Sequence, residues 1–104
     1  MLNLHAYLVN HEMATYFLRV SGDSMSGAGI HDGDLLVVDR SLKPDSGSIV
    51  IADLDGELAV RRLVFRGPRI FLQPENDRYR TVEIPDDNEL HVWGVVTYTI
   101  HKPG

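Results

Sequence analysis

An Asp-Gly pair between two apolar runs constrains the fold of this chain more than any other sequence feature. Residues 49–54 and 58–65 are rich in apolar and β-branched side chains, and Asp55-Gly56 lies between them. A type I′ turn needs positive φ at both of its central positions, and Asp-Gly is one of the pairs that tolerate this geometry. The pattern therefore predicts a β-hairpin made of these two runs.

Turn-forming residues divide the rest of the chain into further short strands. Candidate strands cover residues 15–20, 35–38, 70–72, 81–84 and 91–100, and Gly-, Pro-, Asp- and Ser-rich turns separate them. Gly94 lies inside the last strand, where a bulge or the close approach of another backbone is the usual reason for glycine. Residues 3–10 have apolar residues at helical spacing behind a capping-type Asn3 and predict one short helix. Six or so short strands predict a mainly β, barrel-like or coiled-sheet fold.

Length and charge limit the classes of function. The chain has 104 residues, of which 43% are hydrophobic, so we expect one domain spanning residues 1–104. Its net charge of −5 has the wrong sign for a protein that mainly contacts the phosphate backbone, and direct sequence-specific DNA binding is not expected.

The absence of cysteine excludes thiolate chemistry and disulfides, and it favours a reducing compartment such as the cytoplasm. No apolar run approaches the ~20 residues that span a bilayer. Residues 1–4 show neither a basic region nor a signal core. We therefore expect no membrane anchor and no secretory leader.

The turn run after the first candidate strand presents a serine. Residues 21–29 are mostly Ser, Gly, Ala and Asp, and Ser24 follows the strand end closely. A serine at such a turn has backbone N–H groups beside it that can stabilise an oxyanion, and it needs only a base to become a nucleophile. The same residue types are ordinary turn formers, so the local pattern alone favours a structural role.

Longer segments around this serine carry a family resemblance. Residues 14–25 (ATYFLRVSGDSM) and 29–39 (GIHDGDLLVVD) resemble the catalytic-domain signature of the UmuD and LexA self-cleaving serine peptidases. Segments 47–52, 55–63, 72–76 and 92–96 match in order and spacing. The resemblance covers nearly the whole chain and is closer to UmuD than to LexA. It implies a coiled β-sheet, or β-clip, of the LexA/UmuD catalytic type with a short N-terminal helix.

The resemblance implies a serine and lysine pair, and the lysine is replaced here. Ser24 occupies the nucleophile position, and the backbone of Asp23 and Ser24 would form the oxyanion hole. The general-base position falls on Arg61. Burial can bring the pKa of a lysine from ~10.4 toward neutrality, but a guanidinium stays protonated and can only donate. We therefore expect weak or absent peptidase activity, although the family is one of hydrolases.

The partners of Arg61 are a further expectation. A guanidinium buried without partners is costly, so we expect a carboxylate or several carbonyls within hydrogen-bonding reach of it. The only lysines are Lys43, which precedes Pro44, and Lys102, which lies two residues before Gly104. Neither is a good substitute base.

The function implied by the resemblance is that of an SOS-response mutagenesis protein. The family cuts an N-terminal arm at a Cys-Gly or Ala-Gly bond, and the only Ala-Gly pair here, Ala28-Gly29, lies in the serine turn itself. The chain therefore resembles the trimmed form, which implies an accessory subunit of a translesion DNA polymerase that works with the recombinase filament on single-stranded DNA. A homodimer or a heterodimer with the untrimmed form is implied too. The apolar strand of residues 92–100 would leave an exposed edge unless something covers it, which would also favour self-association.

Two alternatives remain open. The chain could be an active self-cleaving peptidase that acts on an arm supplied by a longer copy or by another chain. It could also be the C-terminal domain of a phage-type repressor, which requires a helix-turn-helix domain that these 104 residues do not include.

Other candidate catalytic patterns are weaker. Gly-Asp-Ser also opens the GDSL hydrolase motif, but Asp87 and His91 are separated by three residues instead of two. His31 could replace the missing lysine as base, although the family gives this position no duty and a polar residue is expected beside a turn.

Metal and polyanion sites are also disfavoured. His5, His11, His31, His91 and His101 lack metal-ligand spacing, and no cofactor is expected. The acidic pairs Asp32 with Asp34 and Asp53 with Asp55 lack the length and glutamate of a calcium loop. The basic residues Arg61, Arg62, Arg66 and Arg69 do not form one patch, because strand alternation places Arg61 and Arg62 on opposite faces.

Overall fold

The computed structural model of the protein describes residues 3–86 and 89–103, and the predicted hairpin lies near the middle of its sheet. Strands β3 (Ile49–Leu54) and β4 (Glu57–Arg66) pair antiparallel, with Leu54 opposite Glu57. Asp55 has a φ of 54° and Gly56 a φ of 88°. Both central residues therefore have the positive φ of a type I′ turn, and the hairpin prediction is confirmed.

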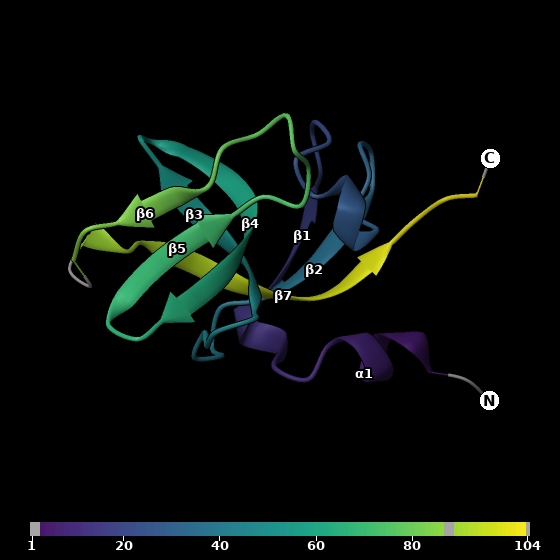
Figure 1. The fold of residues 1–104 in the computed structure, drawn as a ribbon. Coiled ribbons are helices and arrows are strands. Elements are labelled where there is room, and N and C mark those ends of the chain that lie inside the picture. Colours follow the sequence, from purple (N-terminus) through teal and green to yellow (C-terminus); the bar gives the residue numbers. More distant parts are fainter. Residues whose placement is uncertain (1–2, 87–88, 104) are drawn as a thin grey trace.

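The described residues form one antiparallel sheet of seven strands in the order β1-β2-β7-β3-β4-β5-β6 (Figure 1). The other strands are β1 (Thr15–Arg19), β2 (Leu35–Asp39), β5 (Arg69–Gln73), β6 (Val82–Ile84) and β7 (Val92–Ile100). Each strand begins and ends within one residue of its predicted range. The mainly β, coiled-sheet fold class is confirmed.

Strand β7 lies inside the sheet. It pairs with β3 from Val92 to Val95, and it pairs with β2 from Val95 to Ile100. The expectation that residues 92–100 form an exposed edge is wrong, because the chain returns between β2 and β3 instead of adding beside β6. The two edge strands of the sheet are β1 and β6.

Gly94 lets two backbones approach closely within β7. A Cβ atom at this position would lie 2.5 Å from Cγ1 of Val38. The register with β3 also shifts here, because Ile51 faces Gly94 whereas Ala52 faces Val92. Both reasons that the sequence suggests for this glycine, a bulge and a close approach, are confirmed.

Alternating side chains of the coiled sheet feed two hydrophobic clusters. Ile51 of β3 belongs to the first cluster, whereas its neighbours Val50 and Ala52 belong to the second, as the period of a strand requires. The first cluster holds the serine turn through the buried side chains Met25 and Ile30. The second packs β5 against β3 and β4 at the other end of the sheet. The serine turn is thus fixed by core packing.

The N-terminal helix is present but shorter than predicted. Helix α1 (Leu4–Leu8) begins where the Asn3 side chain accepts a hydrogen bond from the Ala6 N–H at 3.1 Å, and it ends because Val9 is extended. Tyr7 contacts Tyr98 of β7, with 5.6 Å between ring centroids. A 3-10 turn, η1 (Glu12–Ala14), then leads into β1.

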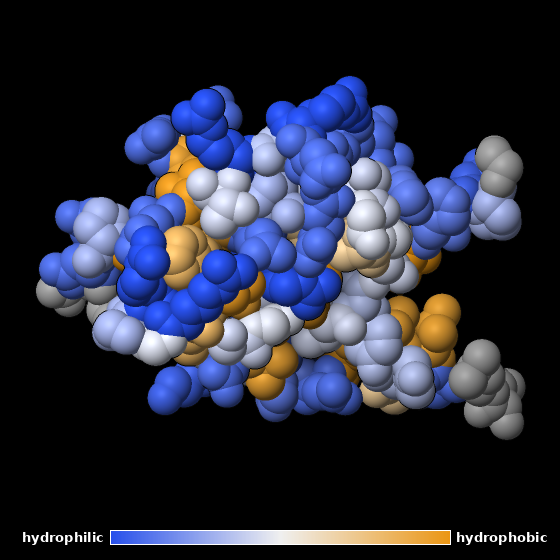
Figure 2. All heavy atoms as spheres, viewed as in Figure 1, coloured by the Kyte–Doolittle hydropathy of each residue, from blue (hydrophilic) through white to orange (hydrophobic). Residues whose placement is uncertain are grey.

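The surface in Figure 2 is predominantly hydrophilic, with small hydrophobic groups between polar ones. Within residues 3–86 and 89–103, no helix has the length and apolar character needed to cross a bilayer.

Candidate active site

The turn that carries Ser24 joins β1 to β2 and is tied at both ends. The Val20 N–H donates to the Asp34 carbonyl at 2.8 Å, and the Ile30 N–H donates to the Met25 carbonyl at 3.2 Å. Met25, next to Ser24, is only 1% exposed and anchors the turn in the core. Ser24 itself is half-buried. The geometry therefore presents its hydroxyl group from a rigid turn.

The segment after β5 holds this turn from the other side. The Glu75 N–H donates to the Ser24 carbonyl at 2.8 Å, and the Gly27 N–H donates to the Glu75 carbonyl at 2.7 Å. A Cβ atom on Gly27 would lie 2.6 Å from that same carbonyl oxygen. The glycine of the short 3-10 turn η2 (Ser26–Ala28) is thus required by a backbone approach.

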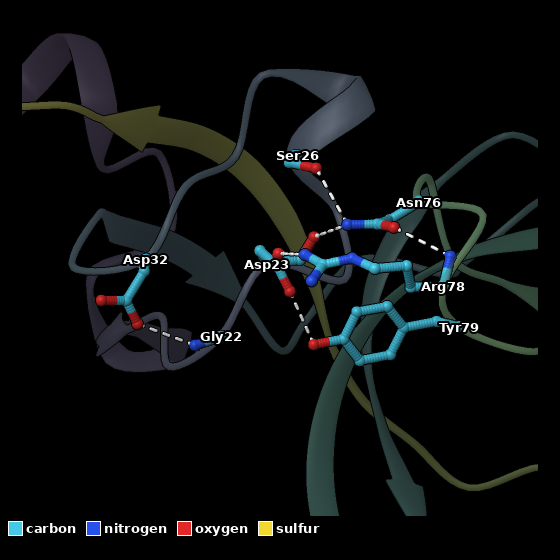
Figure 3. A network of polar contacts seen from close by, with 7 residues as sticks. All are labelled: Gly22, Asp23, Ser26, Asp32, Asn76, Arg78 and Tyr79. Atoms are coloured by element: carbon cyan, nitrogen blue, oxygen red, sulfur yellow. Dashed lines mark hydrogen bonds and ion pairs between the residues drawn. The ribbon is translucent and has the colours of Figure 1, made fainter.

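Side chains from the same segment also hold the serine turn, and we call this segment, residues 75–79, the clamp (Figure 3). The Asn76 amide donates to the Asp23 carbonyl at 2.9 Å and to Ser26 Oγ at 3.3 Å. The Asp23 carboxylate accepts a hydrogen bond from the Tyr79 hydroxyl at 2.7 Å and is paired with Arg78. The sequence analysis gave Asn76, Arg78 and Tyr79 no individual role. No local pattern reveals that they reach a turn more than fifty positions away.

Arg61 of β4 reaches the serine directly. Its Nη1 donates hydrogen bonds to Ser24 Oγ at 2.7 Å and to the Val60 carbonyl at 2.7 Å. Its guanidinium carbon lies 5.8 Å from the centroid of the Tyr79 ring, a cation–π contact. The two residues that the resemblance assigned to the nucleophile and base positions are therefore brought together.

The expected partners of Arg61 are only partly found. Within the described residues, no carboxylate is bonded to its side chain, and its single carbonyl acceptor belongs to the preceding residue. The expectation of a carboxylate or several carbonyls is therefore wrong, because a hydroxyl group, one carbonyl and an aromatic ring surround the charge instead. Burial lowers the pKa of Arg61, and Tyr79 opposes this effect. Arginine nevertheless remains protonated in proteins.

Arg62 points to a different set of partners, as strand alternation predicts. Its Nε donates to Glu75 Oε1 at 2.7 Å, and its Nη1 donates to the Gly47 carbonyl at 2.7 Å. It supports the segment that clamps the serine turn without contacting Ser24 itself.

Other candidate bases lie apart from this contact. The Lys43 and Lys102 side chains are exposed outside the strands, and neither lines the pocket beside Ser24. His31 is also exposed, and its ring packs against that of His101, with 5.4 Å between centroids. Asp87, which the GDSL comparison used, lies outside the described residues.

The acidic pairs take part in turn hydrogen bonds. Asp32 accepts from the Gly22 N–H at 2.8 Å, as Figure 3 shows, and Asp53 accepts from the Gly56 N–H at 2.8 Å. Asp34 accepts from the His31 N–H and contacts the His101 ring. Across residues 3–86 and 89–103 there is no cluster of three or more side chains suited to a metal ion.

A pocket of about 390 Å³ opens beside Ser24 and Arg61. Apolar side chains of β1 to β4 line most of it, among them Leu18, Ile51 and Val60. In the described part of the chain, the N–H groups of Asp23 and Ser24 are not among the donors of the turn's backbone hydrogen bonds. The site thus combines a hydroxyl group, a fixed cation and an apolar recess of a size that admits a peptide segment.

Comparisons with known proteins agree with this geometry. The family model described as Peptidase S24-like matches residues 1–97. Protein MucA of Escherichia coli is 54% identical over 100 residues, which cover 95% of this chain and 68% of that protein. Protein ImpA of Shigella flexneri is 48% identical over 103 residues, covering 97% and 68%. LexA repressor 2 of Pseudomonas syringae pv. tomato is 42% identical over 80 residues, covering 77% and 40%. The resemblance to the UmuD and LexA proteins is confirmed, and the chain belongs to the Peptidase S24-like family.

Proposed function

We propose that this chain is an SOS-response mutagenesis protein that acts as an accessory subunit of a translesion DNA polymerase, with a weak or silent peptidase site. Its UmuD-like character supports the mutagenesis role. The proposed loss of peptidase activity rests on one observation, the 2.7 Å hydrogen bond that Arg61 donates to Ser24 Oγ.

The chemistry of that contact explains the loss. A serine becomes a nucleophile when a neighbouring base accepts its proton as it attacks. Arg61 occupies the place of the base, but a protonated guanidinium has no lone pair to offer. It fixes the hydroxyl oxygen and leaves the hydroxyl proton without a route to a base at that position.

With a silent peptidase site, the proposed function depends on binding to other proteins. We propose that the chain forms a homodimer or a heterodimer with a longer form, binds the catalytic subunit of the polymerase, and works with the recombinase filament on single-stranded DNA. The net charge of −5 fits contacts with proteins better than contacts with the phosphate backbone. These partners place its work in the cytoplasm.

The test of this role is lesion bypass in a reconstituted reaction. The chain, a translesion polymerase catalytic subunit and the recombinase filament are combined on a damaged template, and extension past the lesion is measured. We expect the chain to increase bypass, and Ser24→Ala to increase it equally. If the amount of extension past the lesion is the same with and without the chain, the accessory role is contradicted.

A second candidate function is an active peptidase of the same family. The intact presentation of Ser24, the adjoining pocket and the N–H groups of Asp23 and Ser24 favour it. It requires a base other than Arg61, and the cleavage measurement that closes the Discussion separates the two candidates.

A further inference from the structure

Arg61 brings a positive charge to the pocket without an acidic partner. Both of its hydrogen bonds use Nη1, so Nε and Nη2 have no acceptor among the described residues. Three other arginines of the described residues are paired with carboxylates, namely Arg62 with Glu75, Arg69 with Glu83 and Arg78 with Asp23. The guanidinium in the pocket is therefore available for an anion.

The acidic residue beside Ser24 in the sequence does not serve as that anion. The Asp23 carboxylate is already held by the Tyr79 hydroxyl and by Arg78 (Figure 3). Arg61 lines a pocket whose walls are mostly apolar. Because charge-assisted hydrogen bonds strengthen where water is displaced, an incoming carboxylate would be held strongly there.

We propose that the pocket beside Ser24 is a receptor for the free C-terminal carboxylate of an apolar peptide segment, with Arg61 as the residue that binds the carboxylate. This proposal rests on the silent site proposed above, since a peptide end is retained there and not cut. The Nε and Nη2 groups of Arg61 supply two donors in the fork geometry that matches a carboxylate. Ser24 also lines the pocket, and its N–H is not among the donors of the turn's backbone hydrogen bonds.

The chemistry of the pocket selects this ligand over other anions. Its apolar walls, including Leu18, Ile51 and Val60, match uncharged side chains and exclude a hydrated polyanion. The net charge of −5 also repels nucleic acids and strongly acidic peptides. A single terminal charge on a neutral chain satisfies both conditions.

The test is a titration followed by nuclear magnetic resonance. The ¹⁵N-labelled protein is titrated with an N-acetylated pentapeptide of Leu, Val and Ala that ends in a free carboxylate, and with the same peptide ending in an amide. Since a carboxylate accepts charge-assisted hydrogen bonds that a neutral amide oxygen does not, we expect roughly tenfold or more tighter binding of the acid than of the amide. The shifts should centre on the Asp23 and Ser24 amides and the Arg61 side chain.

Two variants test whether Arg61 causes the preference for the acid peptide. Arg61→Gln should remove the preference for the acid and leave comparable affinity for the amide. The matched control Arg66→Gln removes the same charge from an exposed position on β4 and should retain the preference. Equal affinity for both peptides, no binding of either peptide, or a preference that survives Arg61→Gln would overturn the proposal. Mass spectrometry of the same samples tests the silent site separately, because cut peptide would contradict the proposed function whatever the preference.

Discussion

Arg61 Nη1 and Ser24 Oγ lie 2.7 Å apart, joined by a hydrogen bond that spans 37 positions of the sequence. The hydroxyl oxygen accepts this bond, and a protonated guanidinium cannot accept the serine proton in return. The surrounding turn is held by backbone and side-chain hydrogen bonds and lies beside a pocket that Ser24 and Arg61 line. In the function proposed above, Arg61 therefore leaves the site folded but without a base.

Gly94→Ala should destabilise the fold without touching the site. The new Cβ would meet Val38 Cγ1 at 2.5 Å and Arg40 Cγ at 3.3 Å, and overpacking of this kind costs about 1–3 kcal/mol. Urea unfolding monitored by circular dichroism measures the loss. The exposed Glu57→Ala serves as control and should change the free energy of unfolding by less than about 0.5 kcal/mol. An unchanged midpoint for Gly94→Ala would show that β2 and β7 are not so closely packed.

Asn76→Ala should loosen the serine turn. The variant loses the bonds to the Asp23 carbonyl and to Ser26 Oγ, and we expect a loss of about 1–3 kcal/mol in the free energy of unfolding. Hydrogen exchange at the amides of residues 22–28 should accelerate more than exchange in β3. Asp77→Ala, at an exposed neighbour, is the control. Equal exchange rates in both variants would contradict the clamp.

Acid should destabilise the protein through two buried carboxylates. Burial raises the pKa of Asp34, but hydrogen bonds from the His31 N–H and the His101 ring more than offset this effect, so the pKa of Asp34 lies below its usual range. For Asp39, burial raises the pKa too, and bonds from Ser41 and His11 outweigh that effect. A carboxyl group with a lowered folded-state pKa stabilises the fold above its unfolded pKa, and this stability is lost as the pH falls through the folded pKa.

The corresponding measurement is unfolding by urea between pH 7 and pH 3. The free energy of unfolding should fall below about pH 4. The double variant Asp34→Asn with Asp39→Asn should be less stable at pH 7 and should show a flatter decline, whereas the exposed control Asp77→Asn should keep the slope of the unmodified chain. A double variant that declines as steeply as the unmodified chain would refute the assignment.

Local features of this fold follow from the sequence. The Asp55-Gly56 turn and the Asn3 cap depend on residues within a few positions, so pattern and propensity predict them. The place of β7 depends on which strands meet across the whole chain. Its apolar residues fit an edge strand and an interior strand equally well before the topology is known.

The candidate site divides in the same way. Family resemblance identified Ser24 and Arg61, and the structure brings them into contact. The clamp from Asn76 and Tyr79 was not predicted, because Asn and Tyr in a polar loop carry no local signal of a distant partner. The absence of a carboxylate beside Arg61 was not predicted either. A serine hydroxyl group and an aromatic ring contact the guanidinium in its place.

The most direct test of the central claim is cleavage in trans of a peptide that carries an Ala-Gly bond, followed by mass spectrometry at mildly alkaline pH. The unmodified chain, Arg61→Lys, and Arg61→Lys combined with Ser24→Ala are compared. We predict no cleavage by the unmodified chain, cleavage by Arg61→Lys that rises with pH as the lysine loses its proton, and none by the double variant. Cleavage by the unmodified chain that Ser24→Ala abolishes would show that Arg61 does not silence the site.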